Sequence, residues 1–188
     1  MFGDKEKNEH YYGSDTHKYI NDMIKSTKKM YVISPYLDNY YAGIIASRSP
    51  ATEFYIISSS LENAAKKRLV GSSALPMILL SLVLSFMVLY LELMLGLRGY
   101  ALLTCTMPLI FSMISRFAKS RSMGRIHLKV PKQFVHAKMY ISDKQAISGS
   151  VNMTYKGTHS NVEHIEITRN PQEVEILREQ FWKMWKKY

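Results

Sequence analysis

The stretch HAKMYISDKQAISGSVN, residues 136–152, has the pattern of two short strands joined by a polar turn at residues 143–145. Side chains alternate between the two faces of an extended strand, so His136 and Lys138 point the same way. The apolar side chains on the other face then point to a core: Ala137, Met139 and Ile141. The hairpin gathers polar groups suited to cradling a phosphodiester at one end: His136, Lys138, Ser150 and Asn152.

The composition bounds the class of protein. A chain of 188 residues is one domain, or one domain with an appendage. The net charge of +10 and the pI near 9.6 indicate an anionic partner, either nucleic acid, a phosphorylated substrate or an anionic lipid surface. The single cysteine, Cys105, excludes a disulfide framework and a cysteine zinc site within one chain. The polar N-terminus does not resemble a signal peptide, so we expect a cytoplasmic catalytic part.

The middle of the chain is strongly apolar. Between residues 69 and 115 the only charged side chains are Glu92 and Arg98. A spanning helix needs about 20 apolar residues, and residues 74–94 and 100–115 are predicted to form a transmembrane helical hairpin. Basic residues flank both spans, which predicts that both termini are cytoplasmic: Lys66, Lys67, Arg68, Arg116, Lys119, Arg121 and Arg125. The alternative is a buried helical hairpin in a soluble dimer, which is disfavoured because core helices normally keep a polar face.

The parts on either side of this apolar region are predicted to form one α/β domain, made of residues 15–68 and 125–188, with residues 1–14 as a polar tail and residues 69–124 as hairpin and basic linker. Apolar periodicity predicts helices and buried strands in alternation. The helices are expected near residues 16–28, 40–46, 61–68 and 171–187, and the strands at residues 30–34, 53–59, 125–130 and 164–168. This alternation predicts a mixed β-sheet with helices on both faces.

The last helix has the clearest local signals. Asn170 is a cap, Pro171 occupies the first helical position, and lysines fall in the last turn, where they complement the helix dipole. Its apolar stripe is predicted to be buried in the core: Val174, Leu177, Phe181 and Trp185.

The spacing from His136 is H-x-K, four residues, Asp143, six residues and then G-S-x-N. This pattern resembles the HKD signature of the phospholipase D superfamily, in particular its small single-motif nucleases, over residues 15–68 and 125–188. Glu163 fits the acidic residue that family members commonly carry further along, which supports the histidine. The resemblance implies a phospholipase D-like mixed sheet flanked by helices, here interrupted by the transmembrane hairpin, and phosphodiesterase activity. No cofactor and no metal are expected.

The chemistry accounts for these residue types. A neutral imidazole can attack phosphorus directly, so His136 is expected to form a covalent phosphohistidine that water then hydrolyses. Lys138, Ser150 and Asn152 would hold the non-bridging oxygens and offset the developing charge. Glu163 is expected to accept a hydrogen bond from the other imidazole nitrogen, and Asp143 to be a structural hydrogen-bonding residue at the turn.

The leaving group needs a protonated acid, which in this family is a second HKD histidine. The chain has no second complete copy of the motif, because His127 is followed by Lys129 but has Phe134 where the aspartate would stand. Each remaining histidine is more readily explained as a surface or strand residue: His10, His17, His127, His159 and His164. Single-motif members of the family dimerise so that two motifs meet, and we expect a homodimer here as well.

Three functions remain open at this stage: a membrane-anchored nuclease acting on DNA or RNA, a phospholipase D acting on membrane phospholipids, and an inactive module that binds anionic polymers. The hairpin returns at the start of strand 125–130, about 17 Å from its other end, which directs the site toward the cytoplasm and favours nucleic acid. The expected location is the cell membrane, with two spans and a cytoplasmic catalytic domain. Tyr140 and Tyr155 could stack on bases, and basic residues suit a phosphate backbone: Lys129, Lys132, Lys138, Lys144 and Lys156.

Overall fold

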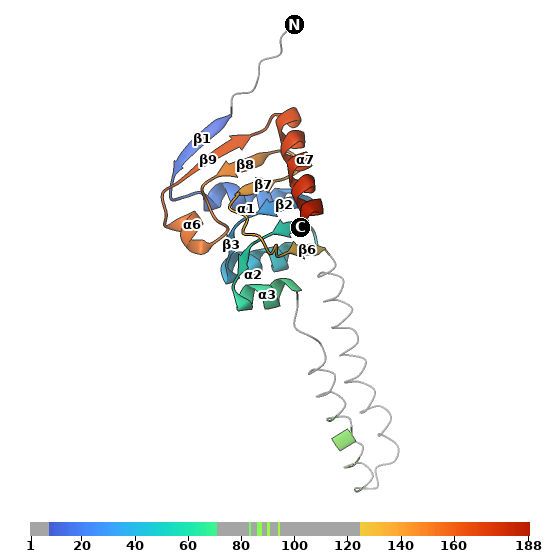
Figure 1. The fold of residues 1–188 in the computed structure, drawn as a ribbon. Helices are drawn as coiled ribbons and strands as arrows, with labels where there is room; N and C mark the ends of the chain where they lie inside the picture. Colours follow the sequence, from blue (N-terminus) through green and yellow to red (C-terminus); the bar gives the residue numbers. More distant parts are fainter. Residues whose placement is uncertain (1–7, 71–82, 84–85, 88–89, 91–93, 95–124) are drawn as a thin grey trace. The chain divides into compact units, whose positions relative to one another are not determined.

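The computed structural model describes residues 8–70 and 125–188, together with the isolated positions 83, 86, 87, 90 and 94. The chain divides into two compact units, one made of Met1–Gly71 and Met123–Tyr188 and the other of Ser72–Ser122. Within the described residues, every strand lies in the first unit (Figure 1).

The first unit is built on a seven-stranded sheet with the order β1-β9-β8-β7-β2-β4-β6. These strands are β1 (Glu9–Gly13), β2 (Lys29–Ile33), β4 (Glu53–Ile57), β6 (Ile126–Lys129), β7 (Met139–Ile141), β8 (Ala146–Gly149) and β9 (Glu163–Thr168). A small parallel sheet pairs β3 (Tyr36–Leu37) with β5 (Ser60–Leu61). The helices are α1 (His17–Ser26), α2 (Asn39–Arg48), α3 (Asn63–Val70), α6 (Tyr155–His159) and α7 (Pro171–Lys187).

The large sheet is mixed and is covered on both faces. Strands β2, β4 and β6 run parallel, and β1, β9, β8, β7 and β2 pair antiparallel in turn. In β2, Met30 and Val32 join the core beneath α1, α2 and α3, while Tyr31 and Ile33 join the core beneath α7. A continuous apolar run such as residues 30–33 is what a strand buried on both faces requires. The predicted mixed sheet flanked by helices is therefore confirmed.

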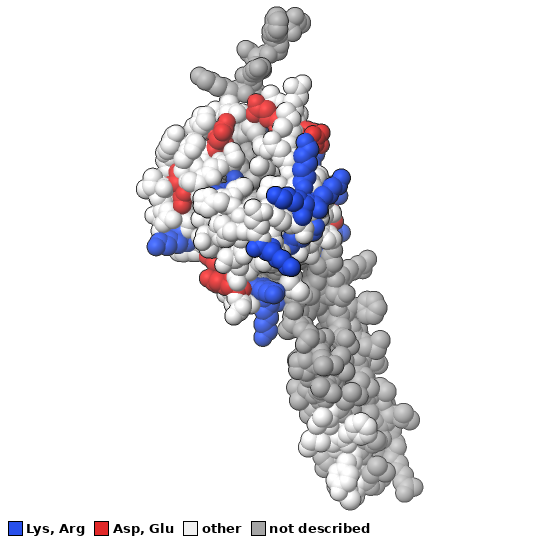
Figure 2. Space-filling model, viewed as in Figure 1, with Lys and Arg blue, Asp and Glu red and all other residues white. Residues whose placement is uncertain are grey.

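Helix α7 forms as its sequence predicts. The side chain of Asn170 accepts hydrogen bonds from the backbone N–H groups of Gln172 (2.9 Å) and Glu173 (3.4 Å), and so satisfies donors that the first turn leaves unpaired. Acidic side chains lie near the N-terminal end of the helix, and basic side chains gather toward its C-terminal end (Figure 2). Within the predicted stripe, Val174 and Phe181 are buried, and Leu177 and Trp185 are partly buried against the same core.

The sheet has two edges of different character. At the carboxyl edge the parallel strands end, and β7 begins there because Met139 pairs with Ile33, the last residue of β2. At the opposite, amino edge the parallel strands begin, and the carbonyl of Arg125 accepts from the N–H of Phe54 at 2.7 Å. Arg125 therefore lies at the amino edge.

Two predictions about the N-terminal tail and the HKD strand are wrong in their boundaries. Residues 9–13 are not a tail but form β1, which pairs with β9 from Glu9↔Ile167 to Gly13↔Glu163. This strand lies at the edge of the sheet and carries mostly polar or exposed residues, so it lacks the apolar run of a buried strand. The hairpin strand β7 starts only at Met139, and Ala137 is exposed rather than in the core.

The predicted transmembrane hairpin lies almost wholly outside the described residues. Within the described part of the chain, no helix combines the length and the apolar character that a bilayer crossing requires. Five positions inside the predicted first span are described. All five are helical and expose 56–69% of their surface: Val83, Phe86, Met87, Tyr90 and Met94.

Candidate phosphodiester site at the carboxyl edge

Gly149 allows the motif to pass close to strand β9. Its φ of 154° is rarely adopted by residues with a side chain, and a Cβ atom there would lie 2.1 Å from the carbonyl oxygen of His164. The next residue, Ser150, donates its backbone N–H to that same carbonyl at 2.9 Å. Glycine is therefore needed so that β8 can run against β9 and deliver Ser150 to the carboxyl edge.

The β7–β8 hairpin brings the two halves of the motif to the same edge. The turn is closed by Ser142, whose N–H donates to the carbonyl of Gln145 at 2.9 Å, and the register pairs Met139 with Ser148. Continued by one residue, this register sets Lys138 opposite Gly149. The structure thus places Lys138 and the Gly149–Ser150 step at the same end of the hairpin.

His136 and Lys138 contact one another directly. The ammonium nitrogen of Lys138 lies 3.2 Å from Nδ1 and 3.1 Å from Nε2 of the exposed His136 ring. Burial lowers the pKa of Lys138 below that of an ordinary lysine, and the negative charge of Glu163 acts in the opposite direction. A phosphate oxygen entering this site would meet the imidazole and the ammonium side by side.

Glu163 has different partners from those predicted. Its buried carboxylate accepts a hydrogen bond from the hydroxyl of Ser150 and another from the side-chain amide of Asn161 at 3.1 Å. Within the described residues it forms no hydrogen bond with His136, in contrast to the expectation. Its charge acts instead on Lys138. Glu163 therefore orients Ser150 and stabilises the charged lysine in this state of the chain.

Asn152 is half-buried and precedes Met153, which pairs with Leu37 of β3. Its side-chain oxygen is buried and has no hydrogen-bond partner among the described residues. The backbone of Met153 forms an isolated parallel β-bridge with Leu37, and its N–H donates to the hydroxyl of Ser34 at 2.9 Å. A buried acceptor without a partner costs about 1–3 kcal/mol, which is typical of a group that is completed by a ligand or by another chain.

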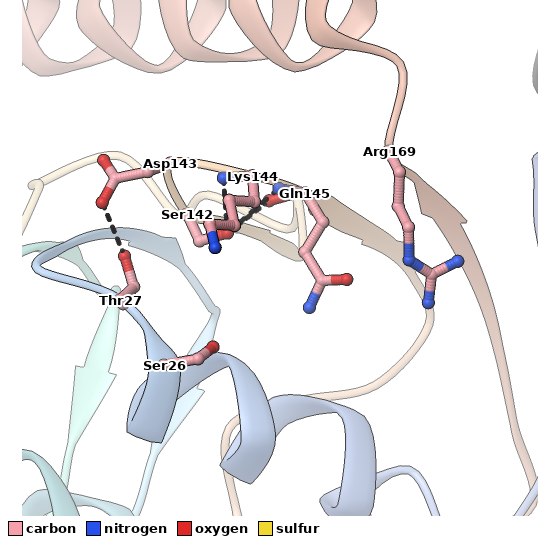
Figure 3. Close-up of a pocket in the computed structure, with 7 residues that line it drawn as sticks. All are labelled: Ser26, Thr27, Ser142, Asp143, Lys144, Gln145 and Arg169. Carbon is pink, nitrogen blue, oxygen red and sulfur yellow. Dashed lines mark hydrogen bonds between the residues drawn. The ribbon is translucent and has the colours of Figure 1, made fainter.

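Asp143 lies at the other end of the hairpin. It follows β7 at the amino edge, where its carboxylate accepts a hydrogen bond from the hydroxyl of Thr27 at 3.1 Å (Figure 3). Together with Lys144 and Arg169 it lines a polar hollow of about 230 Å³ that is separate from His136. The structure agrees with its predicted role as a structural hydrogen-bonding residue.

Some of the residues predicted to stack on bases or to bind phosphates are exposed, and others are buried or occupied by other contacts. Tyr140 is fully buried, its hydroxyl donates to the carbonyl of Val151 at 2.7 Å, and burial raises its pKa, so it is not available for stacking. Tyr155 is 52% exposed. Among the lysines, Lys129 donates to the carbonyl of Trp185 and lies over its ring, and Lys144 is at the amino edge. Two other lysines of the predicted set are exposed: Lys132 and Lys156.

The sequence interpretation overlooked three residues beside the motif. Asn161 holds the Glu163 carboxylate, and Tyr36 and Phe134 form an exposed aromatic pair whose second member lies 6.2 Å from the His136 ring, measured between centroids. An aromatic residue two positions before the motif histidine was a signal that could have identified Phe134.

The gathered groups comprise a potential nucleophile, a cation, a hydroxyl and an amide. The exposed imidazole and the ammonium of Lys138 beside it could meet a tetrahedral phosphodiester, with the ammonium as a donor to a non-bridging oxygen. Within the described residues, no three His, Cys, Asp or Glu side chains form a group that could hold a metal ion.

Comparison with known proteins agrees with this fold. Residues 104–185 match the family described as cardiolipin synthase, PLD-like domain. The chain is similar to the crystal structure of a phospholipase D family member, Nuc from Salmonella typhimurium, with 14% identity, a TM-score of 0.50 and coverage of 96% of this chain and 95% of that chain. It is also similar to NucT from Helicobacter pylori, with 14% identity, a TM-score of 0.53 and coverage of 96% of each chain. No curated protein sequence matches it. The chain therefore has a phospholipase D-like fold.

Proposed function

We propose that this protein is a membrane-anchored phosphodiesterase, acting as a nuclease on DNA or RNA through a phosphohistidine intermediate at a site shared by two copies of the chain. The observation that carries the proposal is the contact of the Lys138 ammonium with the His136 ring, at the end of the hairpin that also delivers Ser150. A nucleophile and a cation side by side suit attack on an anionic diester.

The proposed reaction has two steps. A ring nitrogen of His136 attacks phosphorus and forms a P–N bond, while the P–O bond to the leaving group breaks and the leaving oxygen takes a proton from a second imidazole. Water then attacks the phosphohistidine, gives its proton to that second imidazole and releases the free phosphate end together with His136. Lys138, Ser150 and Asn152 stabilise the negative charge that develops on the non-bridging oxygens.

The second imidazole is proposed to come from another copy of the chain. One histidine cannot attack phosphorus and protonate the leaving group in the same step, because these roles require opposite protonation states on opposite sides of phosphorus. The exposure of His136 is compatible with a second copy of the ring approaching across a two-fold axis.

Nucleic acid is preferred over lipid because the described chain resumes after the apolar segment at the edge of the sheet opposite the candidate site. Arg125, which follows the apolar segment in the sequence, lies at the amino edge, whereas His136 and Ser150 belong to the carboxyl edge. An anchor at one edge favours a substrate that reaches the other edge from solution. The second candidate is a phospholipase D acting on membrane phospholipids, which the family description favours because it names cardiolipin synthase.

The proposed membrane anchor with cytoplasmic termini rests on the apolar sequence and on the described positions of the first predicted span. Large apolar side chains such as Phe86 and Met87 expose 69% and 58% of their surface on a helix. Exposed apolar surface of this kind is typical of contact with lipid or with another protein.

The test is a comparison of substrates with purified full-length protein in detergent. Single-stranded DNA, RNA, duplex DNA and phospholipid in mixed micelles are incubated side by side with wild-type protein and with His136→Asn. The nuclease proposal requires cleavage of a nucleic acid by wild-type protein, loss of that cleavage in His136→Asn and a trapped phosphohistidine. Turnover of phospholipid alone would replace it with the second candidate, and undiminished cleavage by His136→Asn would rule out the assigned nucleophile.

A further inference from the structure

Two pairs of exposed aromatic side chains lie at the carboxyl edge. Tyr36 and Phe134 have ring centroids 5.8 Å apart and expose 46% and 52% of their surface. Tyr40 and Tyr155 have ring centroids 5.2 Å apart and expose 41% and 52%. Each ring thus keeps a large part of its surface open to solvent.

Both pairs are tied to the segments that carry the site residues. The Phe134 ring centroid lies 6.2 Å from that of His136, a separation that one sugar-phosphate unit can bridge. The parallel bridge between Leu37 and Met153 sets Tyr36, just before Leu37, beside Asn152. In the second pair, Tyr155 lies three residues after Asn152 in the sequence. Its backbone N–H donates to the carboxylate of Asp38, two residues before Tyr40, at 2.6 Å.

These four rings are exposed at the surface, although Tyr40 also contacts the buried ring of Tyr41 edge-on, with centroids 5.2 Å apart. Two neighbouring tyrosines show what a structural ring does here, since Tyr41 and Tyr140 are fully buried and donate their hydroxyls to Thr158 and to Val151. Within the described part of the chain, the hydroxyls of the exposed tyrosines have no hydrogen-bond partner: Tyr36, Tyr40 and Tyr155. Aromatic rings that remain partly exposed beside a polar site offer flat apolar surfaces to a ligand.

We infer that the two aromatic pairs are stacking platforms for unpaired nucleobases and that they make single-stranded nucleic acid the preferred substrate. This inference rests on the proposed nuclease function and specifies its substrate class. A base in a duplex already stacks on its neighbours, whereas a base in a single strand has a free face. A base on Phe134 leaves its phosphate beside His136 and Lys138, and the next bases can extend toward Tyr155.

The local chemistry favours this occupant. One face of Tyr155 already stacks on the His159 ring with centroids 4.3 Å apart and an interplanar angle of 12°, which demonstrates the geometry that a base would repeat. Lys156 and Lys132 are exposed next to the two platforms in the sequence and can meet the phosphates. Stacking is tolerant of sequence because every base has a flat face, so little base preference is expected.

The test compares the double variants Tyr36→Ala/Phe134→Ala and Tyr40→Ala/Tyr155→Ala with wild-type protein on three substrates. These are a single-stranded oligonucleotide, its duplex and the small diester methyl p-nitrophenyl phosphate. Each lost stacked base is expected to raise KM for the single strand by between about 5-fold and about 100-fold. The kcat for the small diester should remain within about 2-fold, because the groups that stabilise the transition state are retained.

Controls separate stacking from general damage. Phe134→Trp keeps an aromatic face and should retain single-strand affinity. Ile176→Ala removes a side chain of similar exposure from α7 and should leave KM for the single strand unchanged.

The inference is overturned if wild-type protein cleaves single-stranded nucleic acid while the aromatic variants do so with unchanged KM. It is also overturned if the variants lose the dimer in analytical ultracentrifugation or lose only vesicle binding, since the rings would then meet a second copy or lipid. Failure of the proposed nuclease function would appear differently, as no nucleic-acid cleavage by wild-type protein.

Discussion

The hydroxyl of Ser150 donates a hydrogen bond to the carboxylate of Glu163, and the charge of that carboxylate partly offsets the burial that lowers the pKa of Lys138. The acidic residue of the site thus acts on the lysine and the serine, while the His136 ring contacts the Lys138 ammonium. This arrangement predicts that Lys138 controls how kcat/KM falls at alkaline pH.

The first prediction concerns that alkaline limb. Burial lowers the pKa of Lys138, so its stabilising positive charge is present at neutral pH and is lost as pH rises, at a lower pH than for an ordinary lysine. Glu163→Gln removes the charge that raises this pKa and should move the alkaline limb of kcat/KM to lower pH. The matched control is Glu166→Gln on the same strand, which should leave the limb in place.

Lys138→Arg completes this test, because a guanidinium remains charged throughout the accessible range. Any residual activity of that variant should show no alkaline limb from this group. A limb at the same pH in wild-type protein, Glu163→Gln and Lys138→Arg would assign it to another residue.

The second prediction concerns folding. Gly149→Ala should lower the free energy of unfolding by at least about 2 kcal/mol, because the new Cβ meets the His164 carbonyl in a backbone conformation that alanine rarely adopts. Denaturant unfolding followed by the fluorescence of Trp182 and Trp185 measures the change. Gly43→Ala is the control: within α2 it meets only the flexible end of Arg68, and it should be neutral or stabilising by up to about 1 kcal/mol. Equal effects of the two substitutions would contradict the close approach of β8 to β9.

The third prediction concerns the shared site. Wild-type chains mixed with an excess of His136→Asn chains should lose activity beyond simple dilution, because each mixed dimer has only one working imidazole. If wild-type chains are about one tenth of the total and exchange freely, activity per wild-type chain should fall to about one tenth. Activity that follows only the dilution of wild-type chains, or full activity in a monomer, is incompatible with a site made by two copies.

The fourth prediction concerns metals. Activity should persist in EDTA, because the ammonium of Lys138 and the donors of Ser150 and Asn152 supply the charge stabilisation that a cation provides in other phosphodiesterases. The measurement is the initial rate before and after dialysis against chelator, with and without added Mg²⁺ or Zn²⁺. Loss of activity that a divalent ion restores would show that a metal takes part.

The fifth prediction concerns the proposed membrane hairpin. In a Cys105→Ser background, a cysteine at Gly96 should react with a membrane-impermeant reagent from outside the cell, and a cysteine at Gly124 only after the membrane is opened. This follows from the basic residues on both flanks of the apolar region. Reversed labelling, or a full-length protein that stays in solution without detergent, would refute the anchor.

Local signals predicted much of the fold. The apolar runs at residues 30–33 and 54–57 identified two central strands, and the Asn170 cap with Pro171 located α7. The edge strand β1 was missed because an edge strand with one face exposed carries no continuous apolar run. The short pair β3 and β5 was missed because two-residue strands depend on contacts between distant segments.

The sequence by itself determined which groups make up the candidate site, because the spacing of His136, Lys138, Ser150 and Asn152 on either side of one turn predicts that they lie at the same end of a hairpin. Only the tertiary structure decided how these groups are paired. Glu163 belongs to another strand, and its choice of Ser150 and Asn161 over His136 depends on the register between β8 and β9. Likewise, Tyr36 reaches the site through the bridge of Leu37 to Met153, a contact between residues more than one hundred positions apart. Spacing along the chain fixes which groups share a face, whereas packing between distant segments determines which of them touch.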